Sequence, residues 1–525
     1  MRIVLVYIDN HKKIVGHVFS DEWLICKAVD LPLGLASVRT YSRQDPLINK
    51  ECQFINRIYI DTLSNEAIAD DILSQDPDIV GFSCNLWNFE KTKSVSSFVK
   101  GKNSNIKIVF GGPMVPDDVE SNKLMLDSNS HIDVLIRGEG ELAFKQLLKY
   151  YLNKETISNI PNTALREGNK VFVSEIRSSL KDLSELPSPY LTGDVMVQDD
   201  ATGLVALETS RGCIFDCAYC RYHGGERPRF FNIERLKEEI EYLRSKNFKG
   251  TVFLTDALLN ADPKWAKNVL RVLEGIDFKI CIDVRPELID DEMINLFTKI
   301  PGLAFSVGLQ SINPEALKNI NRPTNIKKCR EAIIKLGKSG VNTGIDLILG
   351  LPGDNYEKFK KTLDWVVYCK ADQVDINDLI IIPNSNLENS VKKFEIKTNK
   401  DNMVLSNYSF TEEDMVKASH FKICFQFLHG FYQKLFFKLV FKFRFKPSDI
   451  IEIFIREANK RGEIPAGRLL DLTGIYFSDK TILSFLKCLF DDRITVKHFL
   501  KLFTEQSERL KENVNYRLEF IKTSE

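Results

Sequence analysis

Three cysteines, Cys213, Cys217 and Cys220, stand within eight residues of one another in the middle of the chain. Three clustered thiolates can bind three irons of a four-iron cluster, whereas a structural zinc site or an electron-transfer cluster uses four protein ligands. The next cysteine along the chain is Cys281, so the sequence places no fourth ligand nearby. The motif therefore predicts an iron–sulfur cluster with one iron left open for chemistry.

The same three cysteines also have simpler interpretations. Free cysteine is a common small core residue, so buried thiols or half of a zinc knuckle are alternatives. The other eight cysteines are scattered, mostly inside apolar segments, and we expect them to be packed thiols.

The residues after position 200 alternate strand candidates with helical stretches. The strand candidates are 204–209, 251–255, 280–284, 303–309, 344–349 and 374–382. The first of them leads directly into the cysteine loop. Six strands with crossover helices predict a partial version of the eight-stranded α/β barrel, in which active sites gather at the carboxyl ends of the strands.

The first 150 residues also alternate buried-strand runs with helical patterns, which is typical of a parallel α/β domain. Strands are expected at 2–8, 79–83, 106–110 and 134–136, and glycines follow the last two of them. Glycine after the carboxyl end of a strand allows a ligand to approach the backbone, although simple turn chemistry is the alternative.

The cysteine loop, with Tyr219 just before the third cysteine, resembles that of the radical S-adenosylmethionine (SAM) superfamily. The segments DPDIVGFS, IVFGGP and DVLIRGEGE are similar to the cobalamin-binding domain of one large group in this superfamily, and VRPEL, VGLQSIN, NRPT and GIDLILGLPG resemble its barrel. The implied α/β fold has a Rossmann-like cobalamin-binding-type domain (1–150), a linker (151–200), a partial (β/α)6 TIM-like radical SAM barrel (201–390) and a helical C-terminal domain (391–525).

The resemblance also implies which residues bind the cofactors. Cys213, Cys217 and Cys220 would bind a [4Fe-4S] cluster. The residues expected to bind SAM are Tyr219, Asp256, Asp283, Arg285, Gln310, Gly344 and Gly350. In the family, such groups hold the methionine amine (Asp256), the ribose (Asp283), the methionine carboxylate (Arg285) and the adenine (Tyr219 and the two glycines). Each residue alone also has an ordinary structural interpretation, such as a helix cap or a turn.

For cobalamin, the resemblance implies Ser83, Gly111 and Gly112 beside the nucleotide tail, with Gly138 and Glu139 closing the domain. One departure from the family's sequence motif leaves open whether this chain binds cobalamin. Relatives that coordinate cobalt through a histidine carry Asp-x-His-x-x-Gly, and here Ile14 stands at the position of the glycine. We therefore expect His11 to be a solvated turn residue. His223 and Glu226, just after the cysteines, could handle protons, but we expect loop solvation for both.

The implied function is that of a radical SAM enzyme. Its cluster would cleave SAM reductively to a 5′-deoxyadenosyl radical, for cobalamin-dependent methylation of an unactivated carbon in a small metabolite or peptide. A rearrangement, cyclisation or epimerisation, with the first domain as scaffold, is one alternative, and a non-catalytic cofactor-binding regulator is another. An electron donor such as flavodoxin or ferredoxin is the implied partner. Methylthiolating relatives are disfavoured, because Cys26, Cys52 and Cys84 do not form a second trio.

The charge balance and hydrophobicity of the chain argue against two classes of partner, nucleic acids and membranes. Lys+Arg and Asp+Glu each total 72, so no net charge attracts nucleic acid or a membrane surface. No run of 18 apolar residues is present, and we expect a cytoplasmic protein. Residues 400–525 carry Phe, Lys and Leu at helical spacing, as in 421–428. This pattern predicts packed helices with a solvated lysine stripe, and a lipid-facing helix is the alternative.

Overall fold

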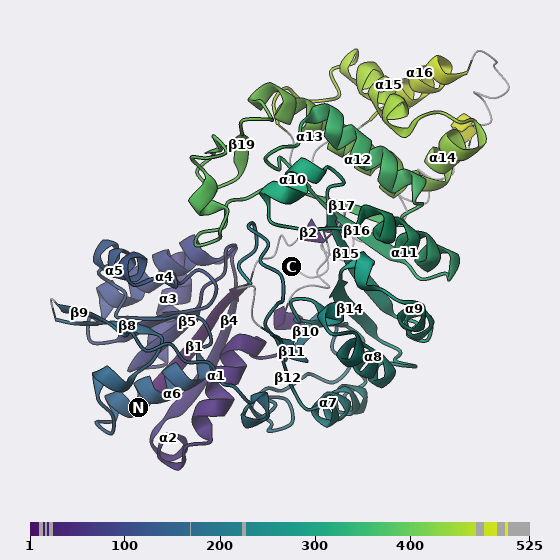
Figure 1. Cartoon of the computed structure of the whole chain (residues 1–525). Coiled ribbons are helices and arrows are strands. Elements are labelled where there is room, and N and C mark those ends of the chain that lie inside the picture. Colours follow the sequence, from purple (N-terminus) through teal and green to yellow (C-terminus); the bar gives the residue numbers. More distant parts are fainter. Residues whose placement is uncertain are drawn as a thin grey trace.

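The N-terminal part of the chain folds around a seven-stranded sheet with the order β4-β1-β5-β6-β7-β8-β9 (Figure 1). Its strands are β1 (Arg2–Asp9), β4 (Gln53–Ile60), β5 (Ile79–Ser83), β6 (Lys107–Gly111), β7 (Val134–Ile136), β8 (Thr163–Glu167) and β9 (Lys170–Val173). Strands β4 to β7 of this order are parallel, and β8 and β9 add two antiparallel strands at one edge.

The computed structural model describes residues 1–9, 14–15, 18–19, 25–168, 170–222, 227–468, 477–490 and 499–501. His11, His223 and Glu226 lie outside these described residues, so their expected roles stay predictions.

Helices cover both faces of the N-terminal sheet. The helices are α1 (Leu33–Arg43), α2 (Pro46–Glu51), α3 (Asn65–Ser74), α4 (Phe89–Lys102), α5 (Val119–Ser128) and α6 (Glu141–Tyr151). Alternate residues of β1 enter different cores: Ile3 and Leu5 share one with α1 and α6, while Val4 lies in the other with α3 and α4. Successive strand residues point to opposite faces, so a strand buried on both sides is apolar throughout, as β1 is.

Four of these strands confirm the sequence expectation, and three were not predicted. Strand β4, with the sequence QFINRIYI, is only half-buried along most of its length because it lies at the sheet edge. Strands β8 and β9 fall inside the segment expected to be a linker. They form because β7 offers a free edge for hydrogen bonding, which is a tertiary condition that the polar sequence there does not reveal.

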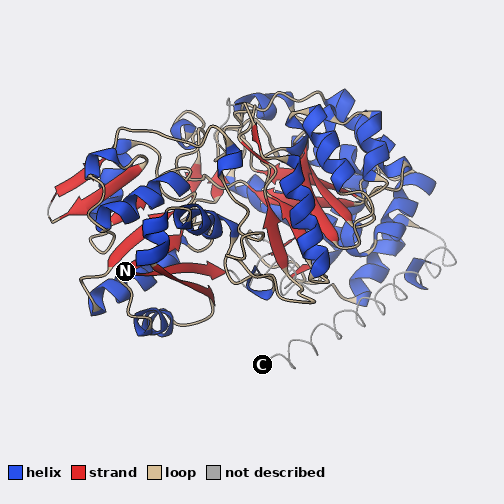
Figure 2. Cartoon of the chain, turned by 90° about the horizontal axis from the view of Figure 1, so that it is seen from below, coloured by secondary structure: helices blue, strands red, loops and turns tan. Residues whose placement is uncertain are grey.

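A second, six-stranded sheet forms the partial barrel, and it lies beside the first sheet (Figures 1 and 2). Its strands, in order, are β10 (Leu204–Leu207), β13 (Thr251–Leu254), β14 (Lys279–Val284), β15 (Leu303–Gln310), β16 (Thr343–Leu349) and β17 (Gln373–Asp378). All neighbouring pairs are parallel, so the carboxyl ends of the strands meet at one edge. The six-stranded barrel inferred from the sequence is confirmed.

Crossover helices cover the outside of this sheet (Figure 1). They include α7 (Ile233–Ser245), α8 (Pro263–Val272), α9 (Asp291–Phe297), α11 (Ile326–Lys338) and α12 (Tyr356–Tyr368), with the short α10 (Pro314–Asn319) after β15. In α7 the Asn232 side chain caps the first turn, and Leu236, Ile240 and Leu243 are buried at helical spacing. Local capping and one apolar stripe are sufficient to place such a helix against the sheet.

The C-terminal part is helical, as expected. It contains α13 (Glu412–Gln426), α14 (Gln433–Phe437), α15 (Pro447–Asn459) and α16 (Asp479–Leu489), preceded by the hairpin β18 (Lys397–Thr398) and β19 (Val404–Ser406). Among the described residues, no helix is both long and apolar enough to span a membrane.

The sequence predicted that the lysines of this region face solvent. This prediction is wrong for Lys422, which is buried in α13. Its Nζ lies 2.6 Å from Oδ2 of Asp378 at the end of β17, and Nη2 of Arg468 lies 2.6 Å from the other carboxylate oxygen. A buried ammonium is tolerated because it is paired. The pair joins the C-terminal helices to the barrel, a contact that helical periodicity alone does not predict.

A two-stranded hairpin, β11 (Ser210–Arg211) with β12 (Arg229–Phe230), closes the base of the cysteine loop. Ion pairs tie this hairpin to the N-terminal domain: Arg211 lies 2.8 Å from Glu141, and Arg229 pairs with Glu139. These charges fix the barrel against the first domain close to the predicted cluster.

The turn after β6 generates a testable difference between two neighbouring glycines. Gly112 has a φ of +99°, and a Cβ there would lie 2.8 Å from the carbonyl oxygen of Cys84, whereas a Cβ on Gly111 would meet nothing within 4 Å. We expect Gly112→Ala to lower the free energy of unfolding by about 1–3 kcal/mol. Gly111→Ala is the matched control and should change it much less. Urea unfolding of the apo protein under anaerobic conditions measures both, and equal losses would contradict this account of the turn.

Candidate active site

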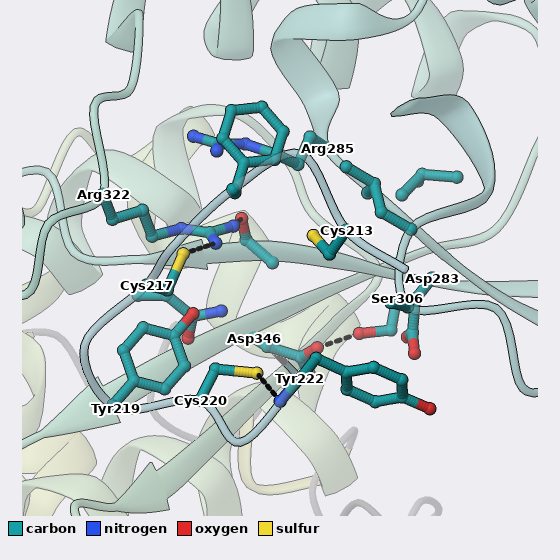
Figure 3. A pocket seen from close by; sticks show the side chains of 16 residues that line it. Cys213, Cys217, Tyr219, Cys220, Tyr222, Asp283, Arg285, Ser306, Arg322 and Asp346 are labelled. Carbon is teal, nitrogen blue, oxygen red and sulfur yellow. Dashed lines mark hydrogen bonds between the residues drawn. The ribbon is translucent and has the colours of Figure 1, made fainter. Parts of the chain in front are cut away.

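A cavity of about 220 Å³ lies between the cysteine loop and the carboxyl ends of the barrel strands. Its lining includes seven residues expected from the sequence: Cys213, Cys217, Tyr219, Cys220, Asp283, Arg285 and Gln310. Other residues reach the same cavity without having been assigned from the sequence: Phe215, Tyr222, Ala257, Leu258, Val284, Ser306, Gly308, Arg322 and Asp346. Figure 3 shows the two guanidinium groups on one side of this space and the carboxylates of Asp283 and Asp346 on the other.

The three cysteines all line this cavity, and the sulfurs of Cys217 and Cys220 accept hydrogen bonds from neighbouring groups. The Cys217 sulfur accepts a hydrogen bond from Nη1 of Arg322 at 3.4 Å, and the Cys220 sulfur accepts one from the Tyr222 backbone N–H at 3.4 Å (Figure 3). Burial raises the pKa of Cys213 and of Cys220. Binding of positively charged iron supplies the favourable interaction that thiolates in such a site need.

The described residues contain no group of three or more Cys, His, Asp or Glu side chains that could hold a single metal ion. The three cysteines nevertheless line one cavity. Thiolates that bind three different irons of one cluster also lie apart from one another, so this arrangement fits the predicted cluster.

Arg285 reaches the cavity from the end of β14 and is only 2% exposed. Its Nη2 lies 2.6 Å from Glu287 and donates to the carbonyl oxygen of Pro323 and to Thr324. The guanidinium carbon lies 3.9 Å from the centre of the Phe215 ring. Among the described residues, Nε and Nη1 have no hydrogen-bond partner. Buried donors without partners cost stability, so each of these two nitrogens fits an acceptor atom of a ligand, such as a carboxylate oxygen.

Two carboxyl groups, Asp283 of β14 and Asp346 of β16, face the cavity from the barrel interior. Burial, with a smaller contribution from Asp256, raises the pKa of Asp283 to about 6. Burial, assisted by Asp375 and Asp283, raises the pKa of Asp346 to about 8, although Arg322 acts in the opposite direction. Ser306 donates a hydrogen bond to Asp346. These groups can accept hydrogen bonds from ligand hydroxyls, and a nearby cation such as a sulfonium would favour their ionised forms.

Gln310 and Tyr219 also lie where a ligand would contact them. Gln310 has a φ of +67°, and the register between β15 and β16 shifts just before it, so a β-bulge turns its side chain toward the cavity. Tyr219 is partly buried beside the cysteines, and burial raises the pKa of its hydroxyl, which is neutral at physiological pH. Both placements agree with the predicted cofactor contacts.

Three residues expected to bind SAM do not line this cavity. The carboxylate of Asp256 instead accepts hydrogen bonds from the Thr209 backbone N–H at 3.1 Å, from the Thr209 hydroxyl at 2.6 Å and from Ser210. It therefore fixes the chain that leads into the cysteine loop, and burial raises its pKa. Its predicted role in holding the methionine amine is not supported by this arrangement.

The other two residues outside the cavity lining are Gly344 in β16 and Gly350 directly after it. Gly350 has a φ of +94°, and a Cβ there would lie 2.9 Å from the Met415 side chain of α13. The Met415 side chain therefore lies close to this glycine, and the predicted contact with adenine stays a prediction. Gly344 pairs with Ser306 and Gln373 near the amino end of β16, and Ser306 lines the cavity although Gly344 does not.

The residues expected to hold cobalamin fall into two groups. Ser83 and Gly111 are register partners at the carboxyl ends of β5 and β6, and Gly112 follows directly. The exposed side chains of Leu63, Leu86 and Trp87 follow the ends of β4 and β5. This edge of the sheet therefore presents glycines and apolar surface together, which fits a large planar cofactor with a flexible tail.

Gly138 and Glu139 lie after β7, and only the glycine is free for such a role. Gly138 has a φ of +62° with open space beside it. The Glu139 carboxylate pairs with Arg229 and lies 3.5 Å from Arg211. We therefore assign Glu139 to the contact between the two domains instead of to cobalamin.

Arg322 and Asp346 were not assigned as site residues from the sequence, although both lie in segments that resemble the family. The sequence gives only a weak indication that either residue belongs to the site. Asp346 is a polar residue at an inward-facing position of a buried strand, since Gly344 and Asp346 alternate with the buried Ile345 and Leu347. Arg322 follows α10, far from the cysteines in sequence, and only the fold brings its guanidinium to Cys217.

Comparisons with known families agree with this geometry. The family model described as the radical SAM superfamily matches residues 207–366, and the model described as a B12 binding domain matches residues 31–148. The two matches confirm the cofactors expected from the sequence, namely a [4Fe-4S] cluster, SAM and cobalamin. They also place the cysteine loop and the glycine-rich sheet edge in separate domains of one chain.

Two curated relatives have similar sequences. The chain is 27% identical over 388 residues to the cobalamin-dependent radical SAM methyltransferase TokK of Streptomyces tokunonensis, covering 70% of this chain and 55% of TokK. It is 27% identical over 378 residues to 2-(S-pantetheinyl)-carbapenam-3-carboxylate methyltransferase of Streptantibioticus cattleyicolor, covering 68% of this chain and 54% of that enzyme. The matches thus span little more than half the length of either relative.

Solved structures support the fold. The cobalamin-dependent SAM radical enzyme OxsB, with aqua-cobalamin and SAM bound, superposes with a TM-score of 0.61 at 13% identity, covering 99% of this chain and 80% of OxsB. The methyltransferase TsrM from Kitasatospora setae gives a TM-score of 0.57 at 14% identity, covering 75% of this chain and 76% of TsrM.

The high pKa of Asp346 predicts a stability effect that depends on pH. The group ionises near 3.8 in the unfolded chain and near about 8 in the folded one, so wild-type stability falls as pH rises between these values. Asp346→Asn removes this loss while keeping a hydrogen-bond acceptor for Ser306. We expect the variant to gain stability over wild type from about pH 4 upward, with the gain levelling above about pH 8. Chemical unfolding of both apo proteins across this range measures the gain, and a constant difference would contradict it.

The hydrogen bond from Arg322 to Cys217 predicts a change in the reduction potential of the reconstituted cluster. A positively charged donor to a ligand sulfur stabilises the reduced, more negative cluster. We expect Arg322→Gln to shift the midpoint potential to a more negative value, and Arg322→Lys to shift it less. Redox titration followed by EPR in the absence of SAM measures the shift. Iron and sulfide analysis must show equal cluster content, and an unchanged potential would show that the contact does not act on the cluster.

Proposed function

We propose that this chain, which belongs to the radical SAM superfamily and carries a B12-binding domain, is a cobalamin-dependent methyltransferase. The acceptor we propose is an unactivated carbon of a small metabolite or peptide. One observation carries the proposal: three cysteines of one loop and the buried Arg285, with two unpartnered nitrogens, line the same cavity. The names of the two curated relatives support the methyl outcome, and one of them names a small-molecule substrate.

When bound, the cluster supplies an electron to the sulfonium of SAM, and cobalamin supplies a carrier for the methyl group. The protein contributes position and charge. Cys213, Cys217 and Cys220 bind the cluster, and Arg285 binds the methionine carboxylate through one of its two unpartnered nitrogens. Phe215 packs on the guanidinium at 3.9 Å and Glu287 pairs with it at 2.6 Å, so its orientation is set before the ligand arrives.

The remaining polar groups of the cavity complete the binding site. Asp283 accepts hydrogen bonds from the ribose hydroxyls, and Asp346 faces the positive end of the ligand. Both carboxyl groups are partly buried, so each interaction with the ligand is made in a region of lower dielectric than water and is stronger than it would be in water. A flavodoxin or ferredoxin is the proposed electron donor.

The test uses the full chain, reconstituted anaerobically with iron, sulfide and hydroxocobalamin and then desalted. We expect wild type to retain a corrin absorbance near one equivalent and, on reduction, to convert SAM to 5′-deoxyadenosine. Cys217→Ala should retain the corrin and lose the conversion, because its sulfur lies in the barrel cavity. Cys369→Ala is the matched control, since this cysteine is buried at the end of α12 outside the cavity.

Each other outcome rejects a specific part of the proposal. Conversion of SAM without retained corrin favours a rearrangement, cyclisation or epimerisation with the first domain as scaffold. Retained corrin without conversion favours a cofactor-binding regulator. Full conversion by Cys217→Ala overturns the assignment of the cluster ligands.

A further inference from the structure

Arg221 directly follows the third cysteine and joins three separate parts of the chain. Its Nη1 donates to the carbonyl oxygen of Pro383 at 2.9 Å, and its Nη2 donates to the carbonyl oxygen of Val115 at 2.8 Å. Nη2 also lies 3.0 Å from Oδ2 of Asp117. One largely buried guanidinium thus connects the cysteine loop with the loop after β6 in the N-terminal domain and with the segment after β17.

The loop after β6 is the part of the N-terminal domain that carries Gly112. Within it, the N–H of Val115 donates to the carbonyl oxygen of Gly112, and the N–H of Met114 donates to that of Cys84, both at 3.1 Å. Arg137 donates to the Asp117 carbonyl oxygen at 3.1 Å from the opposite side. The loop is therefore a hydrogen-bonded unit, and a displacement of Val115 would be passed on to Gly112 at the glycine-rich edge.

Arg221 is not the only residue that joins the cysteine loop to the segment after β17. The N–H of Leu387 donates to the Ala218 carbonyl oxygen at 2.7 Å, and the Asn386 side chain donates to Asp216 at 2.8 Å. These bonds hold the segment after β17 to the cysteine loop directly. The ion pairs of Arg211 and Arg229 join the domains elsewhere, through Glu139 and Glu141 after β7. Arg221 and its partners Val115 and Asp117 thus form a separate link, from the residue beside Cys220 to the loop after β6.

We propose that Arg221 is a positioning residue that fixes the cobalamin-binding loop of the first domain relative to the cluster. The proposal rests on the proposed function, because it assumes both cofactors in one chain. Arginine suits this position, since its planar guanidinium donates hydrogen bonds in several directions at once and remains charged. The ammonium of lysine is a compact point charge and cannot span the same partners. Position matters here because a displacement of about 1 Å between reacting groups can lower a rate by about 100-fold.

The first test needs no cofactor. In the apo protein, we expect Arg221→Gln to raise hydrogen–deuterium exchange in residues 111–118 roughly tenfold, since two charge-assisted contacts are lost. Arg221→Lys should give a smaller increase. Arg229→Gln, which removes a different contact between the domains, is the matched control and should leave this segment unchanged. Unchanged exchange in Arg221→Gln, or an equal rise in Arg229→Gln, would overturn the proposal.

The second test measures the two cofactors together. Pulsed dipolar EPR between cob(II)alamin and the reduced cluster reports their separation in the reconstituted protein. We expect a narrow distance distribution in wild type and Arg229→Gln, and a broader or shifted one in Arg221→Gln, at equal iron and corrin content. A wild-type protein that binds no cobalamin contradicts the proposed function, and the exchange result then decides the role of Arg221 as a link to the loop. A narrow, unshifted distribution in Arg221→Gln overturns the proposal itself.

Discussion

The structure depends on how firmly the cysteine loop is held at the mouth of the barrel. Backbone hydrogen bonds join Ala218 to Ile320 at 2.8 Å and to Leu387 at 2.7 Å, so the loop is attached to the segments that follow β15 and β17. At its base, the hairpin of β11 and β12 carries the arginines that pair with the first domain. Three thiolates can share one cluster only if the backbone between them keeps its shape, and these distant segments supply that constraint.

Charge is distributed around the cavity in a way that favours a zwitterionic ligand. Arg285 and Arg322 are buried on one side, and Asp283 and Asp346 face them from the barrel strands. Arg322 is occupied by Cys217 and the Gly308 carbonyl oxygen, and Arg285 is partly occupied by Glu287. The unpartnered nitrogens of Arg285 and the carboxyl groups with raised pKa values are the interactions left for a ligand to complete.

Much of the fold followed from local patterns, and the exceptions share one cause. Apolar runs identified β1, β5 and all six barrel strands, because strands buried on both faces have to be apolar. Strand β4 lies at a sheet edge, while β8 and β9 depend on the free edge of β7, so their mixed polar and apolar sequences carried little signal. Lys422 was expected in solvent for the same reason: its partner Asp378 lies on another element.

The sequence by itself determined the chemistry of the cysteine loop, since the spacing of Cys213, Cys217 and Cys220 is local and leaves no nearby fourth ligand. It also predicted Asp283 and Arg285 as site residues at the end of a recognisable strand, and both line the cavity. Only the tertiary structure decided that Asp256 accepts hydrogen bonds from Thr209, that Met415 lies beside Gly350, that Glu139 pairs with Arg229, and that Arg322 and Arg221 reach the cysteine loop and its neighbours. Ion pairs and hydrogen bonds form between groups that are close in space, and the order of residues along the chain does not specify that proximity.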